Sequence, residues 1–194
     1  TSITGIHVID ARIFVTDASE SVFLVRYNKQ EKMLEIFADT DVPRYITCST
    51  LVDFDTIVCG DKFGNIFAGR LPAGVTEDLE KDPFGAKDKV VGRSGESLTV
   101  GPPRKLMDIV NYHVGEIVTS IQKTTLMSGG VEVLIYSTIM GGLGILIPFT
   151  SKEDVDFFTH LEMHVRQENN PLCGRDHLAF RSYYFPVKDC IDGD

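Results

Sequence analysis

Short apolar runs alternate with polar turns along the first 150 residues. The runs are rich in Val, Ile, Phe, Tyr and Thr, and the segments between them hold Asp, Asn, Ser, Gly and Lys, the residues that favour turns. This pattern predicts β-strands, and their regular spacing is typical of a sandwich, barrel or propeller. The clearest predicted strands cover residues 12–16, 22–27, 34–38, 45–52, 56–60 and 65–70.

One pattern recurs three times, in residues 15–27, 58–71 and 136–149: a strand, a tight polar or glycine turn, and an apolar returning strand. Asp17 and Asp61 each stand five residues before a returning strand, and those two strands start 44 residues apart. A four-stranded propeller blade takes about 40–45 residues. The third returning strand starts 77 residues after the second, which leaves room for one inserted loop.

The repeat predicts about three antiparallel, WD-repeat-like blades in residues 1–149, with the inserted loop at 72–104. Closed propellers have about four to eight blades. We therefore expect a partial β-propeller, which other segments of a longer parent chain complete. The loop combines Gly, Pro and charges of both signs, so we expect residues 74–101 to be the least regular part of the chain, either as a solvated loop or as a partner contact.

The pattern changes after residue 149. Ser151 is a helix N-cap with an acidic residue three positions later, and Val155, Phe158, Leu161 and Val165 then form a stripe with helical spacing. Two asparagines and a proline at 169–171 end the segment. We expect one amphipathic helix packed on the β body, within a second region at 150–194. The remaining tail contains turns and a predicted strand at 178–185.

Residues 133–149 form an uncharged run of 17 residues. A helix that crosses a membrane needs about 20 predominantly apolar residues. Because two glycines stand between two β-branched runs, we interpret the segment as a buried β-hairpin.

Composition excludes several classes of protein. Hydrophobic residues make up 43% and charged residues 24% of the chain, which excludes disorder throughout. Four cysteines are too few for a disulfide scaffold, and a net charge of −9 is opposite to the basic footprint of a nucleic-acid-binding domain. The start, T-S-I-T-G-I-H-V, has neither a signal peptide pattern nor an initiator Met. We expect it to lie inside a longer protein.

His160 and His164 share one face of the predicted helix, and Cys173 and His177 follow. Such a set can bind zinc, but the string H-L-E-M-H lacks the zincin order, and the alternative is a helix whose histidines face solvent or cap neighbours. The cysteines show no paired spacing. Cys48 and Cys59 are predicted to be small buried residues, Cys173 and Cys190 complete the four, and a reducing compartment fits best.

Other catalytic patterns are weak. A catalytic cysteine with His113 or His177 lacks a family-type flanking sequence. The string G-G-L-G at 141–144 lacks the helix and lysine of a phosphate loop. The acidic residues Asp17, Asp53, Asp55 and Asp61 fit turns better than a catalytic pair. We therefore expect no enzymatic activity, no cofactor and no metal.

Several strings occur in the order found in one protein family. They are P-R-Y-I-T at 43–47, D-K-F-G-N-I at 61–66, N-Y-H-V-G-E at 111–116, Q-K-T-T-L at 122–126, G-G-L-G-I-L-I-P-F-T-S at 141–151, D-F-F-T-H-L-E-M-H at 156–164, L-C-G-R-D-H at 172–177, F-R-S-Y-Y-F-P-V-K at 180–188 and I-D-G-D at 191–194. The chain resembles the C-terminal region of a family of large propeller proteins. That family includes the large propeller subunits of splicing factor 3b and of the cleavage and polyadenylation specificity factor, and the damaged-DNA-binding propeller protein.

Within this resemblance, the wider-family residues are His113, Gly115, Glu116, Arg181, Ser182, Ile191, Asp192, Gly193 and Asp194. We expect structural roles for them. In particular, Arg181 is expected to lie beside an aromatic ring and pair with a carboxylate, and Asp192 to close a turn or cap a helix, rather than to touch RNA. The strings C-G-R-D-H and R-S-Y-Y-F-P point to the splicing branch.

The resemblance implies a non-catalytic scaffold in the nucleus. Its implied partners are the HEAT-repeat and small subunits of the splicing factor 3b complex, which belongs to the small nuclear ribonucleoprotein that recognises the intron branch site. RNA contact would be indirect, and no membrane is implied. The alternative is a propeller adaptor of a DNA-repair or ubiquitin-ligase complex, or of an mRNA 3′-end cleavage complex.

Overall fold

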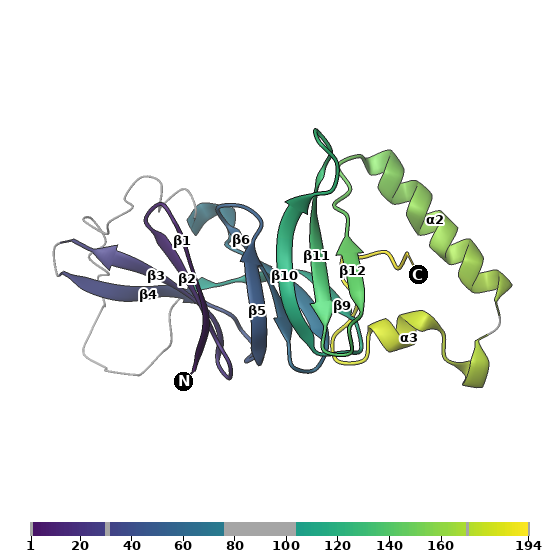
Figure 1. The fold of residues 1–194 in the computed structure, drawn as a ribbon, viewed down its shortest axis with the longest axis horizontal. Coiled ribbons are helices and arrows are strands. Elements are labelled where there is room, and N and C mark those ends of the chain that lie inside the picture. The colour runs from purple at the N-terminus through teal and green to yellow at the C-terminus, as the bar shows by residue number, and fades with distance from the viewer. Residues whose placement is uncertain (1, 30–31, 76–103, 170, 194) are drawn as a thin grey trace. The chain divides into compact units, whose positions relative to one another are not determined.

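The computed structural model describes residues 2–29, 32–75, 104–169 and 171–193 (Figure 1). Most of the loop predicted at 72–104, including nearly all of residues 74–101, lies outside the described residues. Three β-sheets dominate the described part of the chain, which confirms a mainly β, partial propeller architecture. The boundary predicted between residues 149 and 150 stays a prediction.

The first sheet has the strand order β1-β2-β3-β4-β8. Its strands are β1 (Ile3–Ile9), β2 (Arg12–Asp17), β3 (Ser21–Asn28), β4 (Met33–Asp39) and β8 (Arg104–Lys105). The four longer strands pair antiparallel, whereas the two-residue β8 pairs parallel with β4. Phe14, Val22 and Leu24 are fully buried and form the core of this sheet.

The second sheet has the order β5-β6-β7-β9. Its strands are β5 (Ile46–Leu51), β6 (Thr56–Asp61), β7 (Asn65–Arg70) and β9 (Met107–His113). Every residue of β6, and every residue of β7 except its last, is buried. Burial on both faces explains why these strands read as nearly continuous apolar runs rather than as alternating patterns.

The third sheet joins β10 (Val118–Thr125), β11 (Glu132–Thr138) and β12 (Leu143–Leu146) in antiparallel order. The predicted hairpin in residues 133–149 is present as β11 and β12. Its predicted burial is wrong, because Leu143 is 80% exposed and Ile147 is 60% exposed. No helix in the described ranges has both the length and the apolar character needed to cross a membrane.

Contacts divide the chain into two compact units. One comprises Thr1–Ile46, Leu51–Ile57 and Gly69–Met107, and the other comprises Thr47–Thr50, Val58–Ala68 and Asp108–Asp194. The residues of the candidate site below all belong to the second unit.

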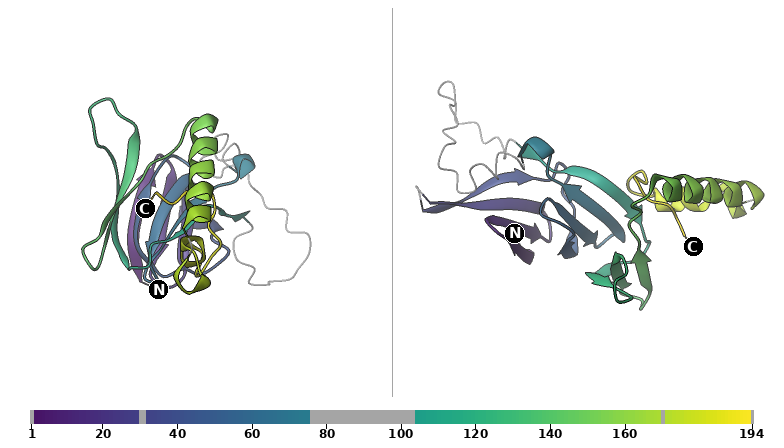
Figure 2. Two further views of the ribbon diagram at one scale, coloured as in Figure 1. Left: turned by 90° about the vertical axis from the view of Figure 1, so that its right-hand side faces the viewer. Right: turned by 90° about the horizontal axis from the view of Figure 1, so that it is seen from above.

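The helices of the second unit are α2 (Lys152–Glu168), a single turn of 3₁₀ helix, η1 (Leu172–Gly174), and α3 (His177–Arg181) (Figure 2). The predicted cap is present, since Ser151 Oγ accepts a hydrogen bond from the backbone N–H of Glu153 at 3.2 Å. The predicted packing of this helix on the β strands through Val155, Phe158, Leu161 and Val165 is wrong, because α2 has no buried residue.

The strand predicted at 178–185 is also wrong. The Asp176 side chain accepts a hydrogen bond from the backbone N–H of Ala179 at 3.1 Å and starts α3 instead. A capped turn of helix satisfies these backbone groups locally, whereas a strand would need a partner. Further along the tail, Lys188 does form a single antiparallel bridge with Asn111 of β9.

In each of the three repeated hairpins, a side-chain oxygen accepts hydrogen bonds from backbone N–H groups of the turn. Asp17 Oδ1 accepts hydrogen bonds from the backbone N–H of Ser19 at 2.8 Å and of Glu20 at 3.0 Å, and this holds the Asp17 pKa down at about 2. Asp61 Oδ1 accepts from the backbone N–H groups two and four residues later, those of Phe63 and Asn65. Thr138, five residues before Leu143, accepts from the backbone N–H of Gly142 at 3.0 Å. The repeat found in the sequence is thus a repeat of turn chemistry.

Candidate functional site

The first part of the candidate site is the turn between β6 and β7. Asp61 is 1% exposed, and its Oδ1 accepts hydrogen bonds from the backbone N–H groups of Phe63 (2.8 Å) and Asn65 (2.9 Å). Gly64 has a positive φ of 81°, and its carbonyl accepts a 2.7 Å hydrogen bond from the backbone N–H of Val114. A Cβ at Gly64 would lie 2.7 Å from the backbone nitrogen of Glu116, so only glycine fits this close approach.

His113, at the end of β9, is connected to this turn through Asn65. The Asn65 Nδ2 donates to Asp61 Oδ2 at 2.7 Å, so its Oδ1 faces His113 Nδ1 at 2.8 Å. Because an amide oxygen only accepts hydrogen bonds, His113 Nδ1 must carry the hydrogen. Burial lowers the pKa of His113, Asp61 opposes this and Arg181 adds to it. The imidazole is therefore neutral at neutral pH. The hydrogen bonds from Asp61 through Asn65 to His113 fix its tautomer.

Aromatic side chains from the C-terminal segment surround the His113 ring. The ring centroids of Phe180, Tyr184 and Tyr183 lie 5.1, 5.4 and 5.8 Å from that of His113. Gly115 makes this approach possible, since a Cβ at that position would lie 2.5 Å from Cζ of Phe180. Gly115 also has a φ of +96°, which glycine adopts without strain.

Arg181, the last residue of α3, forms the second half of the site. Its Nε donates to Asp192 Oδ2 at 2.7 Å and a terminal nitrogen donates to Asp192 Oδ1 at 3.4 Å. The other terminal nitrogen donates to the backbone carbonyls of His113 (3.2 Å) and Val114 (3.4 Å). The side chains of Arg181 and Asp192 are 13% and 5% exposed, so they form a largely buried ion pair.

Tyr112 completes the Arg181 network. The guanidinium carbon of Arg181 lies 4.7 Å from the centre of the Tyr112 ring, in a cation–π arrangement. The Tyr112 hydroxyl donates to Asp192 Oδ1 at 3.0 Å. Burial, as the largest cause, raises the Tyr112 pKa well above its usual value, so the hydroxyl remains a donor. We call the segment from His177 to Asp192, held on β9 by these contacts, the C-terminal clasp.

The structure brings together several residues that the family motif singled out. His113, Gly115, Arg181 and Asp192 meet in one cluster. Glu116 lies at the neighbouring turn, where it accepts a hydrogen bond from Thr138 Oγ1. Ser182 is the C-cap of α3, and its Oγ accepts from the backbone N–H of Val187 at 3.4 Å.

The remaining motif residues contribute less. Ile191 is half-buried, Gly193 is exposed, and Asp194 lies outside the described residues. Arg181 lies beside aromatic rings as expected, those of Tyr112 and Phe180, but it does so from a helix rather than from the strand predicted at 178–185. Sequence reasoning missed Tyr112 and Asn65 as members of the cluster, although both stand inside the strings N-Y-H-V-G-E and D-K-F-G-N-I.

The residues considered for zinc are engaged separately. His160 Nδ1 lies 2.6 Å from the backbone carbonyl of Asp156, His164 pairs with Glu168 at 3.8 Å, and His177 Nε2 lies 3.2 Å from Glu162 Oε1. Cys173 is exposed. Among the described residues, no group of three or more His, Cys, Asp or Glu side chains has the arrangement of a metal site.

The cysteines are free thiols in the structure. Cys59 is buried as predicted, whereas Cys48 is only half-buried. Burial raises the pKa of Cys48, and burial followed by the Asp189 charge raises that of Cys190 to about 11. Both groups are therefore thiols rather than reactive thiolates at neutral pH.

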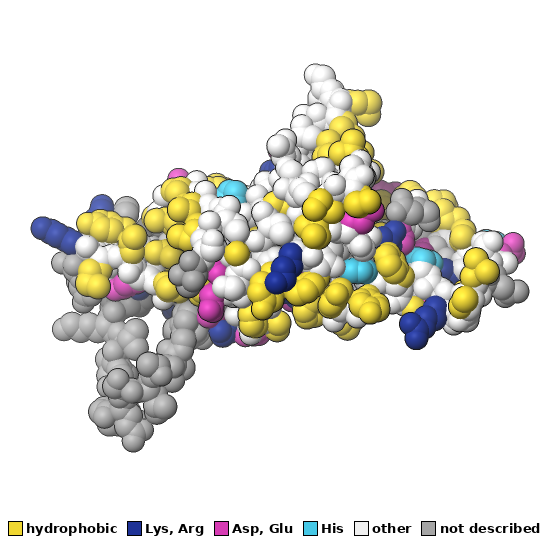
Figure 3. Space-filling view, turned by 60° about the horizontal axis from the view of Figure 1, so that its bottom comes forward, with side chains coloured by type: hydrophobic (Ala, Val, Ile, Leu, Met, Phe, Trp, Pro, Cys, Tyr) yellow, Lys and Arg dark blue, Asp and Glu magenta, His cyan; other side chains and the backbone are white. Residues whose placement is uncertain are grey.

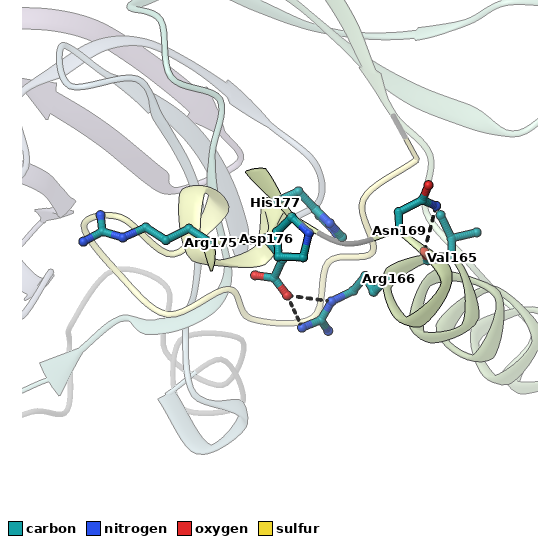
Figure 4. A pocket seen from close by; sticks show the side chains of 7 residues that line it. Val165, Arg166, Asn169, Arg175, Asp176 and His177 are labelled. Carbon is teal, nitrogen blue, oxygen red and sulfur yellow. Dashed lines mark hydrogen bonds and ion pairs between the residues drawn. The ribbon is translucent and has the colours of Figure 1, made fainter. Parts of the chain in front are cut away.

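A small pocket of about 190 Å³ lies between the end of α2 and the start of α3 (Figure 4). Arg166 donates to Asp176 Oδ2 from Nε at 3.1 Å and from a terminal nitrogen at 2.6 Å, and Arg166 is the main cause that lowers the Asp176 pKa. Arg175 also lines the pocket, but its side chain points away from this pair (Figure 4). The pair ties α3 to α2, so we assign it a structural role.

Blade-like sheets followed by a C-terminal clasp define a fragment of a β-propeller protein. The model of the CPSF A subunit region family matches residues 1–194, and the chain belongs to this family. It is 56% identical over 192 residues to a protein of Danio rerio named splicing factor 3B subunit 3, covering 99% of this chain and 15% of that protein.

Other relatives have similar names. The chain is 52% identical over its whole length to the probable splicing factor 3B subunit 3 of Dictyostelium discoideum, of which it covers 15%. It is 41% identical, again over its whole length, to the pre-mRNA-splicing factor RSE1 of Mycosarcoma maydis, of which it covers 16%. The chain thus spans about 15% of the length of the curated relatives that it matches.

Proposed function

We propose that this chain is part of a non-catalytic scaffold subunit of the splicing factor 3b complex, which acts in pre-mRNA splicing in the nucleus. The observation that carries the proposal is the identity of 51–56% across nearly the whole chain to proteins named splicing factor 3B subunit 3. Propeller blades offer wide, rigid surfaces for partners without a catalytic cleft, which suits a scaffold.

The geometry of the His113 and Arg181 site supports a structural role. Its polar groups bind one another: Asp61 to Asn65, Asn65 to His113, and Arg181 to Asp192. A buried arginine that already donates to a carboxylate and to two carbonyls would have to break those bonds to hold a phosphate. The site therefore fastens the C-terminal clasp to β9.

The proposed partners are the HEAT-repeat and small subunits of the complex, together with other segments of the parent chain. Contact with RNA would be indirect. The net charge of −9 supports this, because direct binding to a phosphate backbone is driven by clustered Lys and Arg side chains.

Affinity purification of the tagged full-length parent protein from nuclear extract tests the proposal. We expect the subunits of splicing factor 3b to copurify in stoichiometric amounts, and to remain bound after nuclease treatment because the contacts are between proteins. Recovery of ubiquitin-ligase or 3′-end cleavage components instead would reject the proposal in favour of an adaptor in another complex.

A further inference from the structure

Four exposed aromatic side chains lie beside one another where the C-terminal clasp meets the turn between β6 and β7. Phe63, Phe180, Tyr183 and Tyr184 are 42, 49, 67 and 47% exposed. We call these four residues the aromatic patch. The ring centroid of Tyr184 lies 5.5 Å from that of Phe63 and 5.1 Å from that of Tyr183. Hydrophobic side chains, tyrosine among them, are visible at the surface in Figure 3. Contiguous exposed rings of this kind mark a binding surface.

Tyr183 and Tyr184 form a corner within the patch. The Tyr183 ring stacks on that of His113 with an interplanar angle of 28°, and because Tyr183 is 67% exposed, its opposite face is accessible to solvent. The Tyr184 ring stands at 76° to that of Tyr183 and provides a second wall. In the described part of the chain, neither tyrosine hydroxyl takes part in a hydrogen bond, and no cation lies over either ring.

The clasp holds this corner in place. The backbone N–H of Tyr183 donates to the carbonyl of Phe180 at 3.1 Å. Between these two residues, Arg181 forms its largely buried ion pair with Asp192. Aromatic side chains also have few rotatable bonds, so rings supported in this way lose little conformational entropy when a ligand binds.

The chemistry of the patch favours a positively charged ligand. The face of an aromatic ring carries negative electrostatic potential and attracts cations. One ring of the patch already does so, because Lys62 Nζ lies 5.1 Å from the centre of the Phe63 ring. The compact unit that carries the patch contains 13 acidic and 7 basic residues, so its net negative charge also attracts a basic segment. A planar guanidinium suits such a site best, since it stacks on a ring and donates hydrogen bonds to a tyrosine oxygen.

We propose that Tyr183 and Tyr184 bind an arginine side chain from a basic segment of another protein. The guanidinium stacks on the accessible face of Tyr183, and the Tyr184 ring forms the second wall of the site. The inference rests on the proposed scaffold role for the presence of such a partner, and it deepens that role because it names the chemistry of one partner segment.

Titration of the purified full-length parent protein with labelled peptides tests this inference. The probe is a short peptide of alternating arginine and glycine residues. Its matched control carries citrulline, a neutral side chain of nearly the same shape, in place of each arginine. Fluorescence anisotropy measures the two dissociation constants. We expect the arginine peptide to bind at least about tenfold more tightly than the citrulline peptide.

Substitutions locate the binding to the corner. Tyr183→Leu keeps an apolar side chain but removes the ring, so it should weaken binding of the arginine peptide at least about fivefold, whereas Tyr183→Phe should retain most of the affinity. Tyr27→Leu, at an exposed ring of the first unit, is the matched control and should leave the affinity unchanged. Protection of the β9 amides from hydrogen exchange shows whether the clasp stays folded. Tyr184→Leu supplies the same comparison if Tyr183→Leu loosens the clasp.

Three results would overturn the inference: equal affinity for the arginine and citrulline peptides, equal affinity of the two leucine variants for the arginine peptide, or tighter binding of a polyproline peptide or a single-stranded RNA at the same tyrosines. The titration contains one purified protein only. Its outcome is therefore separate from the question of which nuclear complex the parent protein joins, which copurification decides.

Discussion

At the scale of single residues, Arg181 connects more of the site than any other described side chain. It binds Asp192, two backbone carbonyls of the β9 end and the Tyr112 ring. The sequence predicted that Arg181 would pair with a carboxylate and lie beside an aromatic ring, but it did not identify Asp192, for which a turn or a helix cap was expected. It could not indicate which ring, because Tyr112 lies about 70 positions away along the chain and meets Arg181 only through tertiary folding.

Arg181→Ala should destabilise the clasp. The substitution leaves the Asp192 carboxylate, which is 5% exposed, without its cation. Removing one partner of a buried ion pair costs about 3 kcal/mol. Hydrogen exchange of the β9 amides measures the loss. Arg181→Lys keeps the charge but not the forked geometry, so its amide protection should fall between those of the wild type and Arg181→Ala. Unchanged protection together with weaker, salt-dependent RNA binding would mean that Arg181 contacts RNA instead.

Gly115→Ala should also weaken the clasp. The new Cβ would lie 2.5 Å from the Phe180 ring, and the alanine would have to adopt a φ of +96°. Gly129→Ala is the matched control, since Gly129 has a φ of +77° with nothing within 4 Å of its Cβ position. Overpacking adds about 1–3 kcal/mol to the backbone strain that both variants share. Equal losses in thermal denaturation of the two variants would show that Phe180 does not pack on Gly115.

His113 should make stability depend on pH. Burial lowers its pKa below the usual 6.5, so the folded protein binds this proton less tightly than the unfolded chain. The contribution of neutral His113 to the stability of the folded protein is therefore complete above pH 6.5 and declines as the pH falls below that value. His113→Gln should reduce the pH dependence of the melting temperature between pH 7.5 and about 5.5.

Burial also lowers the pKa of His7, so His7→Gln provides the reference for this comparison. Each substitution should remove only its own part of the pH dependence. If His113→Gln leaves the slope unchanged while His7→Gln abolishes it, the buried, neutral state assigned to His113 is incorrect.

At the scale of elements, side chains in the turns stabilise the hairpins by accepting hydrogen bonds from the backbone. Asp61 accepts hydrogen bonds from two backbone N–H groups and from the Asn65 side chain while 1% exposed. Hydrogen bonds to a charged group contribute about 1.5–3 kcal/mol each, so Asp61→Ala should cost about 3 kcal/mol in total after partial relaxation. The exposed Asp41, substituted in the same way, should cost almost nothing. Similar denaturation midpoints for the two variants would contradict this account.

Local patterns predicted many of the elements. The six predicted strands correspond to β2–β7, and the cap at Ser151 correctly placed the start of α2. Predictions failed where the surroundings decide the outcome. Residues 178–185 are aromatic and resemble a strand, but the Asp176 cap makes their first part helical. Val155, Phe158, Leu161 and Val165 have helical spacing and lie on α2, but spacing alone could not predict that they stay exposed.

At the scale of the whole molecule, the 44-residue repeat was the most informative signal. It marked equivalent turns at Asp17 and Asp61, and the third turn, at Thr138, uses a hydroxyl where the others use a carboxylate. The three sheets described here are fewer than the four or so blades of the smallest closed propellers, so the described residues alone do not form a ring. A local repeat marks individual blades, but it cannot predict which segments close a ring.

Depletion of the parent protein from nuclear extract tests the central claim most directly. The extract is assayed for splicing of a reporter pre-mRNA and, in parallel, for 3′-end cleavage. We predict that depletion abolishes splicing, that the purified full-length protein restores it, and that 3′-end cleavage is unaffected. Normal splicing in the depleted extract, with loss of 3′-end cleavage or of DNA-repair activity, would contradict a role as a splicing scaffold.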